Sequence, residues 1–114
     1  MKKIEELVKE IENINGYIGS AILNKTGEII YIDESENVDL AFSSSLFNDT
    51  FRALNEASLD IGFSDLIRLE TENEEGMIFL IYGNKKYNIF TIFNPKGNIS
   101  LAKILLAKAL KKDR

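Results

Sequence analysis

The sequence has no cysteine, no histidine and no tryptophan, and its single proline is Pro95. Without cysteine the chain has no disulfide, no thiolate nucleophile and no cysteine ligand for a metal. Without histidine it lacks serine–histidine and cysteine–histidine catalytic pairs and histidine-bound metals. Gly16 and Gly19 come without the Gly-Lys-Ser/Thr ending of a phosphate-binding P-loop. Carboxylates are therefore the main groups left for catalysis.

The length and charge of the chain limit its organisation and its partners. Its 114 residues suit one domain over residues 1–114. The formal net charge is −4, and the basic cluster Lys108, Lys111, Lys112 and Arg114 lies where a helix should end. Phosphate contacts dominate nucleic-acid affinity, so we expect no nucleic-acid partner. Apolar runs fall short of the ~18 residues of a membrane span, and charges interrupt the N-terminal segment, so we expect a cytoplasmic protein without membrane insertion.

Hydrophobic periodicity predicts helices and strands in the order α-β-β-α-β-β-β-α. The expected helices cover residues 1–15, residues 38–61 and a final segment capped by Asn98 or Ser100. The expected strands cover residues 17–24, 28–33, 65–72, 77–82 and 87–93.

The strand patterns predict an antiparallel sheet covered on both faces. Segments 77–82 and 87–93 are apolar throughout and suit the sheet interior, whereas 65–72 alternates and suits an edge. Segment 28–33 is also apolar on both faces, so we expect it to be covered on both. Helices must then lie on both sides of the sheet, which predicts an α+β fold of three layers.

Two small residues, Gly19 and Ala21, share one face of the strand 17–24. Glycine within a strand often marks the close approach of another backbone. A helix that crosses tightly over this point is the simplest explanation. A ligand pocket lined by Gly19 and Ala21 is the alternative.

The helix 38–61 has more apolar surface than one sheet contact needs. Its apolar side chains spread over about 180°, whereas an ordinary surface helix needs about 100°. The predicted sheet-facing stripe is Leu40, Phe47, Phe51 and Leu54. The apolar strip left over is Phe42, Leu46, Ala53 and Ala57. The polar side of the helix carries Asn48, Arg52, Asn55 and Glu56.

An exposed apolar strip usually marks an interface, so we expect this chain to associate with itself. The alternative is a second contact inside the same fold, with a loop or the first helix.

Two acidic clusters are the remaining candidates for chemistry. The first comprises Asp33, Glu34, Glu36 and Asp39, and the second Glu70, Glu72, Glu74 and Glu75. The first cluster suits the N-terminus of a helix and lacks the spacing of a calcium loop. The second lies on an expected solvated hairpin. We therefore predict no catalytic residue, no metal and no cofactor, and an acid/base enzyme is the minor alternative.

The element order and several segments resemble the Roadblock family, which is related to dynein light chains. The likeness extends over almost the whole chain and includes GYIGSAILNKTGEII, LIRLETENEEGMIFLIYGNKKYNIFTIF and the closing helix after NPKGNISLAK. It implies a five-stranded antiparallel sheet, with the middle helix on one face and the terminal helices on the other. It also implies dimerisation through the middle helix and an edge strand. Such domains are scaffolds or regulators, commonly of small GTPases, and one bacterial member of a gliding-motility system is a GTPase-activating partner.

The strip and the resemblance together predict a non-enzymatic homodimer that binds another protein, for which a small GTPase is the candidate. The predicted dimer or partner interface comprises Phe42, Leu46, Phe47, Thr50, Ala53, Leu54, Ala57, Arg68 and Glu70. One departure from the family is the phenylalanine-rich middle helix, where many members have smaller residues. A small-molecule-sensing α+β module is the alternative function.

Overall fold

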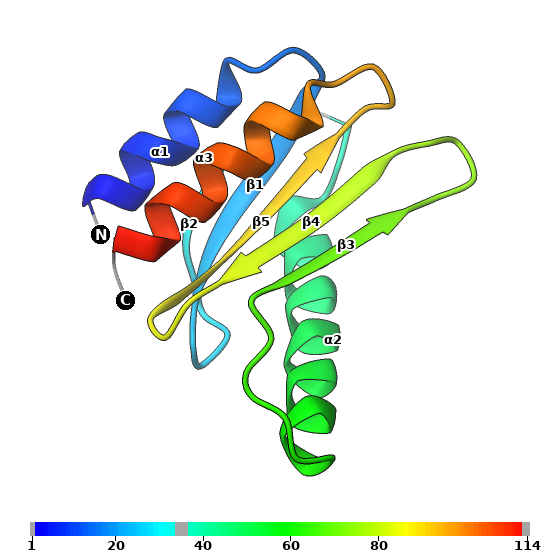
Figure 1. The fold of residues 1–114 in the computed structure, drawn as a ribbon. Coiled ribbons are helices and arrows are strands. Elements are labelled where there is room, and N and C mark those ends of the chain that lie inside the picture. The colour runs from blue at the N-terminus through cyan, green and yellow to red at the C-terminus, as the bar shows by residue number, and fades with distance from the viewer. Residues whose placement is uncertain (1, 34–36, 113–114) are drawn as a thin grey trace.

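The computed structural model describes residues 2–33 and 37–112. Within them lie three helices and five strands in the predicted order (Figure 1). The helices are α1 (Lys2–Glu12), α2 (Leu40–Asp60) and α3 (Ile99–Lys112). The strands are β1 (Tyr17–Asn24), β2 (Ile29–Asp33), β3 (Arg68–Glu72), β4 (Ile78–Gly83) and β5 (Tyr87–Phe93). Among the described helices, none is long and apolar enough to cross a membrane.

Local side-chain chemistry explains where the helices begin and end. The Asp39 carboxylate accepts from the backbone N–H of Phe42 at 3.0 Å and caps α2. Asn98 does the same for Leu101 at 3.3 Å, which confirms it as the cap of α3. Helix α1 ends three residues earlier than predicted, and the chain then turns through Gly16 at a φ of +88°.

The five strands form one antiparallel sheet in the order β2-β1-β5-β4-β3. The segments 77–82 and 87–93 are interior strands and 65–72 contains an edge strand, as predicted. Strand β3 begins only at Arg68, because Asn55 of α2 holds the preceding segment: the Leu66 N–H donates to its side-chain oxygen at 2.5 Å. The prediction that 28–33 is covered on both faces is wrong for Ile30, which is 39% exposed. Strand β2 lies at the other edge of the sheet and has only one strand neighbour.

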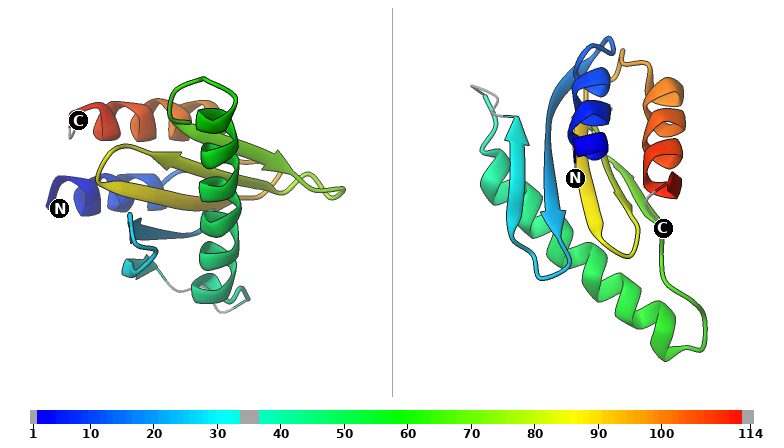
Figure 2. Two further views of the ribbon diagram at one scale, coloured as in Figure 1. Left: turned by 90° about the horizontal axis from the view of Figure 1, so that it is seen from below. Right: turned by 90° about the vertical axis from the view of Figure 1, so that its left-hand side faces the viewer.

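Helices cover both faces of the sheet, which confirms the three-layer α+β fold. Helices α1 and α3 lie side by side on one face, and α2 crosses the other alone (Figure 2). The core under α1 and α3 includes Ile4, Val8, Ile22, Leu80, Phe93 and Leu106. The core under α2 includes Ala21, Leu23, Leu40, Phe51, Phe90 and Ile92.

Gly19 is the point where α2 crosses the sheet most closely. A Cβ atom at this position would lie 2.7 Å from Cδ1 and 3.0 Å from Cδ2 of Leu40. The predicted tight helix crossing is therefore confirmed. The alternative of a ligand pocket at Gly19 and Ala21 is wrong, because Leu40, itself buried, fills that space.

Candidate functional site

Helix α2 presents an apolar strip to solvent along its length. Phe42 is 63% exposed and Leu46 is 50% exposed, and Ala53 and Ala57 are exposed on the same side. Thr50 lies exposed among them, and its hydroxyl donates to the Leu46 carbonyl at 3.0 Å. The exposure of the strip agrees with the sequence pattern. Its use as an interface stays a prediction.

The buried side of α2 differs from the predicted stripe. The structure buries Leu40, Ser44, Asn48 and Phe51. Leu54 was predicted to face the sheet and is 42% exposed, whereas Asn48 was predicted on the polar side and is 1% exposed. Leu40, Phe51 and the half-buried Phe47 do face the sheet, as predicted. The helix is rotated only far enough to bury Asn48 and expose Leu54, and the strip stays exposed.

Hydrogen bonds between side chains hold this rotation. Asn88 of β5 donates its amide N–H to the Asn48 oxygen at 2.7 Å, and both side chains are buried. Lys25 donates to the Asn88 oxygen at 3.1 Å, which fixes the orientation of that amide. Asn55, about two turns after Asn48 in α2, donates its amide N–H to the Asp65 carboxylate at 2.9 Å. Buried amides need partners, so turning α2 to bury its apolar strip would break these bonds.

Phe47 joins the strip to the core. Its ring stacks on Phe79 and on Phe90 with centroids 5.0 Å apart in each pair, and the side chain is half-buried. Of the predicted interface residues on α2, Phe47 thus makes ring contacts within its own chain and has less surface left for a partner.

The exposed apolar surface continues beyond the helix, which the sequence analysis did not foresee. Four exposed side chains lie in or beside the segment that joins α2 to β3: Leu59, Ile61, Phe63 and Ile67. The run of apolar residues across Gly62 was the signal that could have indicated it, since a solvated loop rarely needs them.

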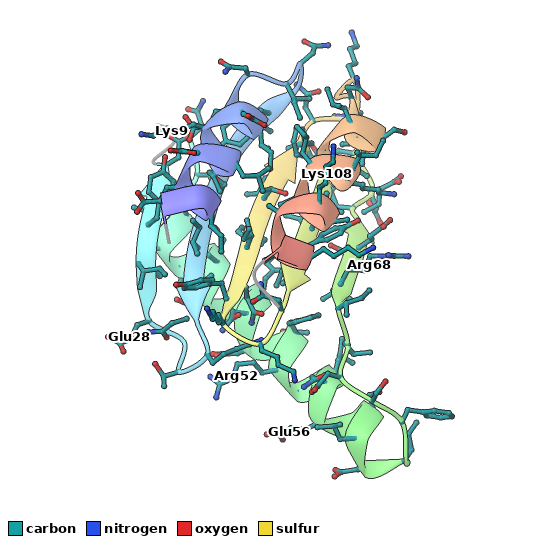
Figure 3. The ribbon with its side chains drawn as sticks, turned by 60° about the vertical axis from the view of Figure 1, so that its left-hand side comes forward. Lys9, Glu28, Arg52, Glu56, Arg68 and Lys108 are labelled. Atoms are coloured by element: carbon teal, nitrogen blue, oxygen red, sulfur yellow. The ribbon has the colours of Figure 1, made fainter. Side chains whose placement is uncertain are left out.

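Arg68 and Glu70 do not join the α2 strip. They pair in register with Tyr82 and Leu80, whose side chains belong to the core under α1 and α3. Glu70 accepts from Lys103 of α3 at 2.8 Å. Figure 3 shows Arg68 beside α3, well away from Arg52 of α2. The predicted interface is therefore divided between two faces of the molecule, because neighbouring strand residues alternate sides.

Two carboxylates of the first acidic cluster, Asp33 and Asp39, have structural roles. Asp33 accepts from the Tyr17 hydroxyl at 2.7 Å, and Asp39 caps α2. Burial raises the pKa of Tyr17. Glu34 and Glu36 lie outside the described residues. Within the described ranges, no three acidic side chains are grouped to hold a metal ion.

The predicted basic cluster lies at the end of the last helix, as expected for the lysines that the structure describes. Lys108 and Lys111 lie toward the C-terminal end of α3, where cations complement the helix dipole. Arg114 lies outside the described residues.

Comparisons with known proteins place the chain among a set of similar folds. No protein-family model matches the sequence. An uncharacterised protein of Methanocaldococcus jannaschii is 25% identical over 109 residues, which are 96% of this chain and 92% of that protein.

Solved structures resemble the chain more clearly than sequences do. MglB of Myxococcus xanthus has a TM-score of 0.81 at 16% identity, with 96% of this chain and 84% of that chain covered. A structure described as MglB with a tetrameric arrangement has a TM-score of 0.79 at 12% identity, covering 97% and 85%. A Roadblock domain from Streptomyces avermitilis has a TM-score of 0.75 at 10% identity, covering 95% and 88%. At these identities the likeness concerns the fold.

Proposed function

We propose that this chain, which has the Roadblock fold, is a non-enzymatic homodimeric scaffold or regulator that binds another protein. The observation that carries the proposal is the exposed apolar strip of α2. The structure described as a tetrameric arrangement of MglB is consistent with self-association in proteins of this fold.

The energetics of the strip favour a second copy of the chain as its cover. Burying a large apolar side chain stabilises by about 1.5–3 kcal/mol, so covering the exposed half of Phe42 or Leu46 is worth about 1 kcal/mol each. In a two-fold symmetric dimer the same patch is used by both copies, so each contribution counts twice. Helix α2 is also alone on its face of the sheet, whereas α1 and α3 cover each other. A second α2 laid beside the first would supply the missing neighbour.

Light scattering on the purified chain tests the dimer. We expect a mass of twice 12.9 kDa at tens of micromolar protein. A strict monomer would overturn the dimer. Leu46→Asp and Phe42→Asp place a charge in the strip and should yield monomers with unchanged circular dichroism, because a buried unpaired charge is costly.

The matched control is Ile104→Asp on α3. The Ile104 side chain is 60% exposed, a fraction similar to that of Phe42, and it lies on the opposite face of the sheet. This variant should remain dimeric. A dimer that survives Leu46→Asp and dissociates in Ile104→Asp would place the interface on the α1 and α3 face.

A small GTPase is the candidate second partner, and the support is the family resemblance together with the fold. The test is a pull-down from the native organism with the wild-type chain as bait, performed with excess GDP and with a non-hydrolysable GTP analogue. We expect a GTPase to be enriched in one nucleotide condition. Equal recovery with Leu46→Asp would separate the partner site from the dimer strip. Absence of any GTPase in both conditions would refute this partner.

A further inference from the structure

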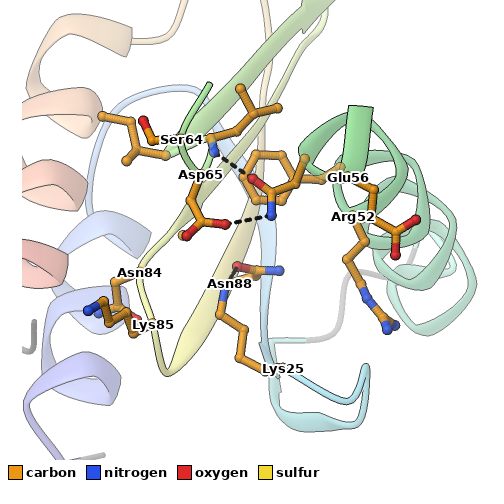
Figure 4. A pocket seen from close by; sticks show the side chains of 13 residues that line it. Lys25, Arg52, Glu56, Ser64, Asp65, Asn84, Lys85 and Asn88 are labelled. Atoms are coloured by element: carbon orange, nitrogen blue, oxygen red, sulfur yellow. Dashed lines mark hydrogen bonds between the residues drawn. The ribbon is translucent and has the colours of Figure 1, made fainter. Parts of the chain in front are cut away.

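A cavity of about 810 Å³ lies on the α2 side of the sheet, away from Gly19. It is bounded by the second half of α2, the segment before β3, and the turns that follow β1 and β4 (Figure 4). Phe51, Leu66 and Ile67 supply apolar lining. Its volume falls within the range of about 300–1,000 Å³ that small-molecule sites occupy.

Three cations from three separate segments line this cavity, with Lys85 on the side opposite Arg52 (Figure 4). They are Lys25 of the β1–β2 turn, Arg52 of α2 and Lys85 of the β4–β5 turn. Within the part of the chain that the structure describes, none of the three forms an ion pair. Two carboxylates, Glu56 and Asp65, also line the cavity, so the charged side chains of its lining carry a net charge of +1. This sign is opposite to the net charge of −4 of the whole chain.

The polar groups around the cavity differ in how many hydrogen bonds they already make. Both ends of the Asn88 amide are engaged, one by Lys25 and one by Asn48. Both ends of the Asn55 amide are engaged as well, by Asp65 and by the Leu66 N–H. The Asn88 amide is thereby held in place beside Lys25. The ammonium group of Lys25 has donors left over, since an ammonium has three and one is used.

Lys25 is the cation most affected by this environment. Burial lowers its pKa, the nearby Asp65 partly offsets that effect, and Arg52 adds repulsion. Lys25 is exposed and makes no ion pair among the described residues, so its ammonium is open to an anion from solution. Arg52 is exposed, and its guanidinium lies against the same turn, at Gly27.

We infer that this cavity binds a small soluble anion through a phosphate group held by Lys25 and Arg52. A phosphate matches these two cations because it is multiply charged and offers several acceptor oxygens. The planar guanidinium of Arg52 suits bidentate contact with two of them. An apolar part of the ligand would rest on Phe51 and Leu66. The inference does not depend on the dimer, because the strip with Phe42 and Leu46 lies on another side of α2.

The test is a titration of the ¹⁵N-labelled full chain with pyrophosphate, followed by NMR at constant ionic strength set with sodium chloride. We expect saturable shifts of the amides at Lys25, Lys85 and Asn88. Arg52→Gln and Lys25→Met should each weaken binding at least tenfold. Lys108→Met, an exposed lysine on α3 far from the cavity, is the matched control and should bind like the wild type. Non-saturating shifts, or equal affinity in all variants, would overturn the inference.

A second variant tests the sign of the charge. Glu56→Gln removes a carboxylate from the cavity lining and should tighten pyrophosphate binding several-fold, because like charges repel. Glu56 is exposed, so the variant should fold normally even if Lys25→Met does not. Weaker binding of pyrophosphate to Glu56→Gln would overturn the inference independently of the lysine variants.

Discussion

Replacing Gly19 by alanine should destabilise the fold, although the same change is mildly favourable in an unobstructed strand. The added methyl would lie 2.7 Å from Cδ1, 3.0 Å from Cδ2 and 3.3 Å from Cγ of Leu40. All three distances are shorter than ordinary contact between carbon atoms, which lies near about 3.5–4.0 Å. Leu40 is buried at the start of α2 and has little room to move.

The expected magnitude follows from two opposing effects. Overpacking a core by one methyl typically costs about 1–3 kcal/mol. Removing a glycine from the unfolded chain returns about 0.4–1 kcal/mol. We therefore expect Gly19→Ala to lower the free energy of unfolding by about 1–2 kcal/mol.

Urea unfolding followed by circular dichroism measures this change, and a double-mutant cycle tests its cause. Leu40→Ala alone should cost about 2–5 kcal/mol because it leaves a cavity. In Gly19→Ala/Leu40→Ala the new methyl partly fills that cavity, so the double variant should be more stable than the sum of the single effects by at least about 0.5 kcal/mol. Strict additivity, or a neutral Gly19→Ala, would refute the close crossing and reopen a pocket at this point.

Two further predictions concern polar contacts. Asn48→Ala leaves the buried Asn88 amide without its acceptor and should lower the free energy of unfolding by about 1–3 kcal/mol, measured in the same urea assay, whereas no change would show that this bond does not hold α2. Burial, followed by the hydroxyl's bond to Glu12, raises the pKa of Tyr31 from 10.0 to about 12. Between those two pH values the unfolded chain loses the Tyr31 proton before the folded chain does, so stability should fall as pH rises through this window. Tyr31→Phe should flatten that part of the alkaline stability curve, and an unchanged slope would assign it to other groups.

Much of the fold could be predicted because the relevant forces act locally. The bounds of β1 and β5 match the prediction, and each is marked by turn residues and an apolar run. The acidic edge strand around Glu70 and the cap at Asn98 follow from solvation and backbone hydrogen bonding, which neighbouring residues decide. The exposure of Phe42 followed from the width of the apolar arc on α2.

The candidate sites were harder to predict because they join distant parts of the chain. Arg68 belongs with α3 rather than with α2, since the register of β3 on β4 decides which face each side chain takes. The cavity gathers Lys25, Arg52 and Lys85 from three segments, and no local pattern relates them. Periodicity also treats Asn48 as solvated, because it ranks residues by polarity and not by available partners.

The sequence by itself determined which elements form, their order, and that α2 carries more apolar surface than one sheet can cover. Only the tertiary structure decided the final rotation of α2, which buries Asn48 and exposes Leu54. The physical reason is that this rotation depends on Asn48 and Asn88, which lie 40 positions apart and form a buried hydrogen bond. In that rotation Phe42 and Leu46 face outward. A long-range polar contact thus supports the orientation of the apolar surface that we propose this protein uses.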